Sequence, residues 1–275
     1  METILQAVIM GIVQGLTEFL PISSTAHLII VPYLAGWDDP FITSLEFSVM
    51  LHLGTLAALL VYFWRDWLRL VPAWLASLRD RSLAADPDRK LAWLILAATI
   101  PAALAGFLLE DLVSTGFREI GIVAVSLVIG AGLLWLVDRA TPQNREIGTL
   151  SLQAAVGIGV MQSVALLPGV SRSGASIGGG LIAGLTRAEA ARFSFLMAAP
   201  IIAGAGAYET LQLLRGAGDV QFEPAALAAG MLAAFASGLA AVAFMLRYLR
   251  THSFSIFVAY RLIVAVVVIV AFLTP

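Results

Sequence analysis

The 275-residue chain contains no cysteine, and only 12% of its residues are charged. The lack of cysteine excludes a disulfide framework and a thiolate metal site. Soluble domains are roughly 25% charged, and the net charge of −2 gives no indication of a nucleic-acid partner. Hydrophobic residues make up 60% of the chain and the mean hydropathy is +0.94. A soluble domain of this size cannot bury so much apolar surface, so we expect an integral membrane protein.

Six apolar segments are long enough to cross a hydrocarbon core of about 30 Å as helices. They lack the alternation of a membrane barrel, so we predict an all-α polytopic fold. Two further apolar regions, 2–35 and 150–185, are interrupted at Leu20-Pro21 and at Pro168-Gly169. Each half is too short to cross alone, which indicates two re-entrant helical hairpins. The six predicted spans are 42–64, 91–109, 119–137, 193–214, 224–246 and 254–273.

The connecting segments differ in charge. Arginine and lysine gather in 65–90, 138–147 and 247–252, whereas 36–40, 110–119 and 215–223 are mainly acidic. Basic loops remain in the cytoplasm. This rule predicts that the first hairpin enters from the outer side, that the second enters from the inner side, and that both termini lie outside.

The chain also repeats itself around its two breaks. The segment GIVQGLTEFLPISSTAH resembles GVMQSVALLPGVSRSGA, with Pro21 opposite Pro168 and Ser24 opposite Ser171, at an offset of 147. We therefore predict one membrane domain, 1–275, built from inverted repeats that cover approximately 1–137 and 148–275. Folds of this kind bring their broken helices together near the bilayer midplane.

The residues at the breaks are suited to binding an anion. Pro21 ends the first half-helix, and hydroxyl residues follow that are typical of helix N-caps. Two half-helix N-termini that face each other would direct free N–H groups and partial positive charge at a ligand. Arg172 offers a planar fork for a phosphate, although it could instead pair with an acidic side chain. The break residues that we expect to contact the anion are Ser23, Ser24, Thr25, Gly169, Ser171 and Ser173.

Two residue pairs near the first break carry candidate chemistry. Gln14 and Glu18 are four residues apart and share a helix face, and Glu18 could serve as a base, orient a histidine or bind a metal. Ser24 and His27 also share a face and form a candidate nucleophile–base pair, although Ser24 could be only a cap. His52 lies inside a predicted span, and we leave open whether it has a function or only packs.

Taken together, these residues resemble the undecaprenyl pyrophosphate phosphatase family, also known as the bacitracin-resistance family. The likeness rests on QGLTEFLPISSTAH and on PGVSRSGAS, which resembles the family motif PGxSRSxx[ST], and it extends over the whole chain. It implies a bacterial inner-membrane enzyme that hydrolyses undecaprenyl pyrophosphate to undecaprenyl phosphate and phosphate. Such an enzyme recycles the lipid carrier for peptidoglycan synthesis and confers bacitracin resistance.

The match also implies residue roles. Glu18, His27 and Arg172 fall on catalytic positions, while Ser24, Ser171 and Ser173 fall on phosphate-site positions, with Ser24 a candidate nucleophile. Gln14 stands where the family has Glu or Gln, and Ser176 stands where it often has Thr. The sequence does not decide whether Ser24, His27 or water is the nucleophile.

The expected partners are the polyprenyl pyrophosphate substrate and bilayer lipids, with a homodimer as one option for assembly. Mg²⁺ or Ca²⁺ supports the family's activity, and Glu18 is a candidate ligand for it. Because position 14 is Gln, we expect such a cation to be bridged by the pyrophosphate. The alternative function is a secondary transporter or flippase of an anionic lipid phosphate, because such proteins share inverted repeats and broken helices.

Overall fold

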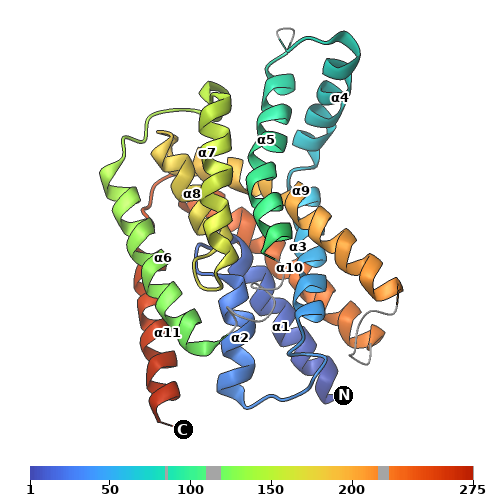
Figure 1. Cartoon of the computed structure of the whole chain (residues 1–275), viewed down its shortest axis with the longest axis vertical. Helices are drawn as coiled ribbons and strands as arrows, with labels where there is room; N and C mark the ends of the chain where they lie inside the picture. The colour runs from blue at the N-terminus through green and yellow to red at the C-terminus, as the bar shows by residue number, and fades with distance from the viewer. Residues whose placement is uncertain (84–85, 110–118, 216–222, 275) are drawn as a thin grey trace.

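The computed structural model describes residues 1–83, 86–109, 119–215 and 223–274, and these residues form an all-helical bundle without a named strand (Figure 1). Six of the described helices are long and apolar enough to cross a membrane. They agree with the six predicted spans within four residues at each end, except that the fourth begins at Arg187 and not at 193. These helices are α3 (Leu45–Tyr62), α5 (Pro87–Leu108), α6 (Ile120–Ala140), α9 (Arg187–Leu214), α10 (Pro224–Tyr248) and α11 (Ser255–Leu273).

The outward faces of these helices are apolar, as lipid requires. In α11, for example, Ile263, Val266 and Val270 are all exposed, whereas Ala265 and Val268 are buried. An apolar exterior of this kind is stable only in a bilayer or detergent. The prediction of a multi-pass membrane protein is confirmed. Of the acidic loops used for the orientation, parts of 110–119 and 215–223 lie outside the described residues.

One helix was not expected from the sequence. The basic segment 65–90, which the sequence indicates only as a polar loop, contains α4 (Trp64–Asp80). Its inner face buries Leu70, Ala73 and Ser77 against the bundle, while Arg69 and Arg79 lie on the outer side. The helix is therefore amphipathic. Because one of its faces is charged, it does not stand out in the sequence as a uniformly apolar segment. It packs against α5 at the end of the bundle opposite both termini (Figure 1).

The two broken regions form paired short helices. In the first, α1 (Glu2–Phe19) is followed by α2 (Ser24–Ala35). In the second, α7 (Leu152–Ser163) continues into a short 3₁₀ turn, η3 (Val164–Leu166), and is followed by α8 (Arg172–Ile182); another short turn, η2 (Ile147–Thr149), precedes α7. Helices of 11 or 12 residues span only about 18 Å, less than the hydrocarbon core. Re-entry of these pairs into the bilayer stays a prediction.

The helix contacts are those that two related halves would produce. Helix α1 packs against α10, and its counterpart α7 packs against α5, the counterpart of α10. Both contacts are very close: a methyl group on Gly11 would collide with the carbonyl oxygen of Gly230, and one on Gly159 would collide with that of Ala98. Small residues permit such close helix packing in membranes. The inverted repeats, approximately 1–137 and 148–275, stay a prediction.

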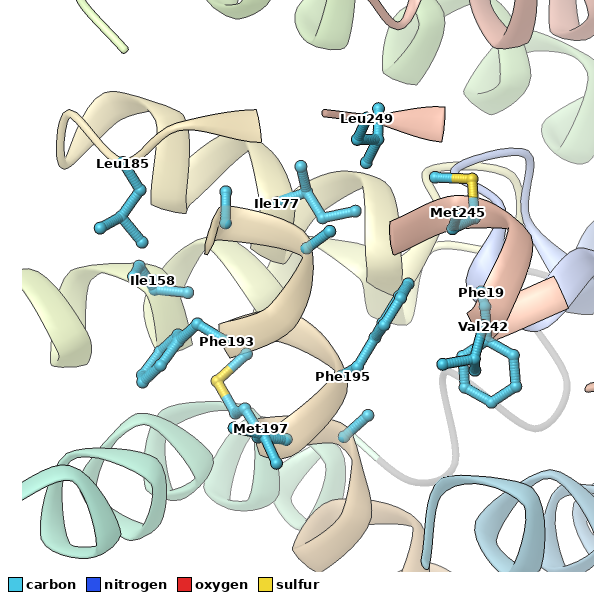
Figure 2. Packing of buried hydrophobic residues seen from close by; sticks show 14 of the residues in the cluster. Phe19, Ile158, Ile177, Leu185, Phe193, Phe195, Met197, Val242, Met245 and Leu249 are labelled. Carbon is cyan, nitrogen blue, oxygen red and sulfur yellow. The ribbon is translucent and has the colours of Figure 1, made fainter. Parts of the chain in front are cut away.

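The largest cluster of buried hydrophobic residues lies around α9 and packs against the end of α1, next to the first break. Figure 2 shows Phe193, Phe195 and Met197 of α9 among side chains from neighbouring helices. Phe19, the last residue of α1, packs edge-on against Phe195 with ring centroids 5.4 Å apart. Because aromatic pairs of this geometry are favourable, the contact fixes the end of α1 and with it the adjacent Glu18.

Candidate functional site

Both short helices after the breaks begin with the same capping geometry. The side-chain oxygen of Ser23 accepts a hydrogen bond from Ala26 N, and that of Ser171 accepts one from Gly174 N. The two caps have positive φ angles, 74° for Ser23 and 77° for Ser171. A non-glycine residue in this conformation costs about 1–3 kcal/mol, and such strain gathers at functional sites. Because the caps correspond, the structure aligns Ser171 with Ser23 rather than with Ser24, at the offset that also relates Gln14 to Gln162.

The two breaks contact each other directly. Gly169 N donates to the Ser23 hydroxyl oxygen at 3.1 Å, and the Ser173 hydroxyl donates to the Leu20 carbonyl at 3.1 Å. Gly169 itself has φ of +111°, and a methyl group there would lie 2.7 Å from the carbonyl oxygen of Val123. Only glycine fits this position. The predicted meeting of the two broken segments is therefore found.

A polar cavity of about 120 Å³ lies between the two helix N-termini. The first N–H groups of a helix have no acceptor within it and bear partial positive charge. The N-terminus of α2, which begins at Ser24, and that of α8, which begins at Arg172, both contribute to the wall. The lining residues are Glu18, Ser23, Ser24, Thr25, His52, Ala165, Ser171 and Arg172.

Glu18 is the centre of the polar contacts in this cavity. Its Oε2 accepts hydrogen bonds from the Ser24 hydroxyl at 2.5 Å and from Gln14 Nε2 at 3.0 Å, and its carboxylate also pairs with Arg172. The Glu18 side chain is 2% exposed and that of Arg172 is 23% exposed. A buried carboxylate that accepts a hydrogen bond from a serine hydroxyl at this distance has the geometry of a base beside a nucleophile. The alternative that Arg172 pairs with an acidic side chain is the one seen here.

His52, whose role the sequence left open, lies in this cavity. Its Nδ1 lies 2.7 Å from the Ser48 carbonyl oxygen, and since a carbonyl can only accept, Nδ1 is the donor. Its Nε2 lies 3.4 Å from Glu18 Oε2. His52 and Glu18 are far apart in the sequence and on different helices. The only sequence signal was an ionisable side chain inside a span, which marks a functional candidate in membrane proteins.

His27 lies on the other side of the first break. Its Nδ1 donates to the Ser23 carbonyl at 2.7 Å, and in the neutral ring its Nε2 accepts from the Tyr260 hydroxyl at 2.8 Å. The two rings also stack, with centroids 5.6 Å apart. The structure thus brings Ser24 to Glu18 and brings His27 to Tyr260, and it does not join Ser24 to His27. A catalytic role for His27 stays a prediction.

The remaining predicted residues surround the second break. The hydroxyls of Ser171 and Ser173 lie 3.1 Å apart, and Ser176 shares a hydrogen bond of 2.6 Å with Ser194 of α9. Ser176 also donates to the Arg172 carbonyl, so its hydroxyl is engaged in holding α8. The roles of these serines in binding a substrate stay predictions.

The donor set does not fit a divalent cation held by protein ligands alone. Within the described residues there is no group of three His, Cys, Asp or Glu side chains that could hold a metal ion. Among the described residues that line the cavity, Glu18 is the one carboxylate, and it already pairs with Arg172. Hard cations take six or more oxygen ligands. The expectation of a cation bridged by the pyrophosphate stays a prediction.

The comparisons with known proteins agree over nearly the whole chain. A family model described as bacitracin resistance protein BacA matches residues 7–267. A protein of Rubrobacter xylanophilus named undecaprenyl-diphosphatase is 47% identical over 272 residues, with 98% of each chain covered. Proteins with the same name from Thermomicrobium roseum and Desulforudis audaxviator are each 43% identical, over 271 and 265 residues, with 96% of each chain covered.

Proposed function

The chain belongs to the bacitracin resistance protein BacA family, and we propose that it is an undecaprenyl-diphosphatase. It hydrolyses a phosphoric anhydride in a lipid substrate, undecaprenyl pyrophosphate, and releases phosphate and undecaprenyl phosphate. The observation that carries this function is the cavity in which Ser24, Glu18 and Arg172 meet at two helix N-termini. A transporter would need no such pairing of a hydroxyl with a buried base.

Binding of the pyrophosphate uses the positive ends of α2 and α8. Their free N–H groups donate hydrogen bonds to the oxygens of the terminal phosphate, and Arg172 turns its guanidinium from Glu18 toward the substrate. Arg172 is the more exposed partner of the ion pair, so its side chain loses few buried contacts when it moves. Releasing Arg172 leaves the Glu18 carboxylate free to take a proton. Substrate binding and activation of the base are coupled in this way.

The chemical step proceeds from the hydrogen bond between Ser24 and Glu18. The Ser24 oxygen attacks the terminal phosphorus while its proton passes to Glu18, and the anhydride bond breaks to release undecaprenyl phosphate. Water then attacks the phosphoserine. Ser24 leaves with the proton held by Glu18, and phosphate departs with the protons of the water. Direct attack by water, with Glu18 as its base, is the alternative route.

Phosphate release from undecaprenyl pyrophosphate by the detergent-purified protein tests the function. We expect turnover by the wild type and a loss of at least a hundredfold in Ser24→Ala and in Arg172→Ala. Ser237→Ala is the matched control, since its hydroxyl bonds the Ala233 carbonyl outside the cavity. A folded wild type without turnover would contradict the proposal. Full activity of Ser24→Ala would leave the enzyme standing and select the water route.

The orientation and assembly are also proposals. The basic residues of α4 and of the α4–α5 connection lie at the end of the bundle opposite both termini (Figure 1), which supports a cytoplasmic position for that end in an inner bacterial membrane. We propose that the cavity opens to the outer face. Because the chain has no cysteine, labelling of Thr25→Cys by an impermeant thiol reagent on intact spheroplasts tests this access. No labelling from outside would contradict it. Homodimer formation stays a prediction.

A further inference from the structure

Arg261 of α11 contacts both breaks at once and lies outside the chemistry described above. It is 0% exposed, and it is the largest fully buried side chain among the described residues. Its Nη1 donates to the Pro21 carbonyl at 3.3 Å. Its Nη2 donates to the carbonyls of Gly169 at 2.6 Å and Val170 at 3.1 Å. One side chain therefore joins the backbones of two segments that are about 150 residues apart.

The charge of Arg261 has no acidic partner among the described residues. No carboxylate of the described residues lies within ion-pair distance of its guanidinium, and its Nε has no hydrogen-bond partner there. A buried guanidinium that is satisfied only by carbonyl groups is costly, and intramembrane cations of this kind mark functional sites. The three carbonyls belong to residues one or two positions before the caps Ser23 and Ser171, which line the cavity.

The surrounding backbone is shaped to admit this guanidinium. A methyl group on Gly130 of α6 would collide with Nη2 of Arg261 and would lie 2.8 Å from the Val170 carbonyl oxygen. An ideal methyl group on Gly174 of α8 would lie 3.5 Å from Nη1. The side chain thus occupies a slot between α6, α8 and the two breaks. Within this slot it can hold the breaks in one relative position.

We propose that Arg261 is a positioning residue that locks the two breaks together, so that Glu18, Ser24 and Arg172 face one another across the cavity. The inference rests on the proposed function, because it assigns Arg261 to the same reaction without contact to the reacting atoms. Three carbonyls are held by a planar fork, which a lysine cannot reproduce. The uncompensated charge behind the caps also favours an anion in the cavity.

The kinetic test compares two replacements of Arg261. Arg261→Lys keeps the charge but loses the fork, so we expect kcat to fall at least tenfold while KM stays within threefold. Arg261→Gln also loses the charge, so we expect the same fall in kcat together with a rise in KM of at least threefold. Arg145→Gln is the matched control, since Arg145 donates to the carbonyls of Ala183 and Thr149 away from the cavity. It should leave kcat and KM unchanged.

A second variant displaces the guanidinium without removing it. Gly130→Ala should reproduce the kcat loss of Arg261→Lys, whereas Gly132→Ala on the same helix, where a methyl group meets open space, should not. This pair keeps the inference testable if the Arg261 variants fail to fold. Wild-type kcat in folded Gly130→Ala, or in folded Arg261→Lys, would overturn it.

A structural measurement separates this inference from the proposed function. Thr25 of α2 and Ala165 of η3 both line the cavity, one next to each break, and the chain has no cysteine, so Thr25→Cys and Ala165→Cys accept a unique pair of spin labels. Pulsed electron resonance should show a broader distance distribution when Arg261→Lys is added. An unchanged distribution would overturn the positioning role, whether or not the protein releases phosphate. Absence of turnover in the wild type would contradict only the proposed function.

Discussion

The replacement Glu18→Gln removes the proposed base while it keeps the size of the side chain. The Glu18 carboxylate is 2% exposed, pairs with Arg172 and accepts hydrogen bonds from Ser24 and Gln14. Breaking a buried ion pair costs about 3–5 kcal/mol, and the partial exposure of Arg172 places this one near the lower figure. By the scaling of soluble domains of similar size, about 3 kcal/mol lowers the unfolding temperature by ~6–12 °C.

The effect of Glu18→Gln on activity should be larger than its effect on folding. A general base contributes about 10²–10⁴ to the rate, which corresponds to about 3–5 kcal/mol in the activation free energy. Initial rates of phosphate release, measured well below the unfolding temperature of the variant, report this loss. Glu189→Gln is the control, since Glu189 accepts one hydrogen bond from Ile147 N outside the cavity. A kcat of Glu18→Gln within tenfold of the wild type would refute the assignment of Glu18 as the base.

Two further predictions concern packing and the histidine of the first break. Gly159→Ala should lower the unfolding temperature of the detergent-solubilised protein, because the added methyl group would collide with the Ala98 carbonyl. Gly157→Ala on the same helix places its methyl group in open space and should leave the unfolding temperature unchanged. Equal unfolding temperatures of the two variants would argue against the close contact. Tyr260→Phe removes the hydroxyl that bonds His27 and should cost about 1 kcal/mol of stability. It should lower kcat less than tenfold, well short of His27→Ala, and equal losses of phosphate release in both variants would contradict this ranking.

Much of the architecture could be predicted from local properties of the chain. Uniformly apolar segments of about 20 residues identify spans, because the bilayer leaves no other stable arrangement for them. Pro21 and the hydroxyl residues after it indicate a break and a helix start, since both effects act within one turn. The shift of the repeat from Ser24 to Ser23 opposite Ser171 required the cap geometry itself, because adjacent serines look alike in a sequence.

The amino-acid sequence by itself therefore determined the membrane character, the six spans, the two breaks and the chemical types of Glu18, Ser24 and Arg172. Only the tertiary structure decided which groups meet. It joined Ser24 to Glu18, brought His52 to the same carboxylate from another helix, and set Arg261 against both breaks. The physical reason is that local preferences act between residues a few positions apart. Contacts between helices depend on packing that no local pattern encodes.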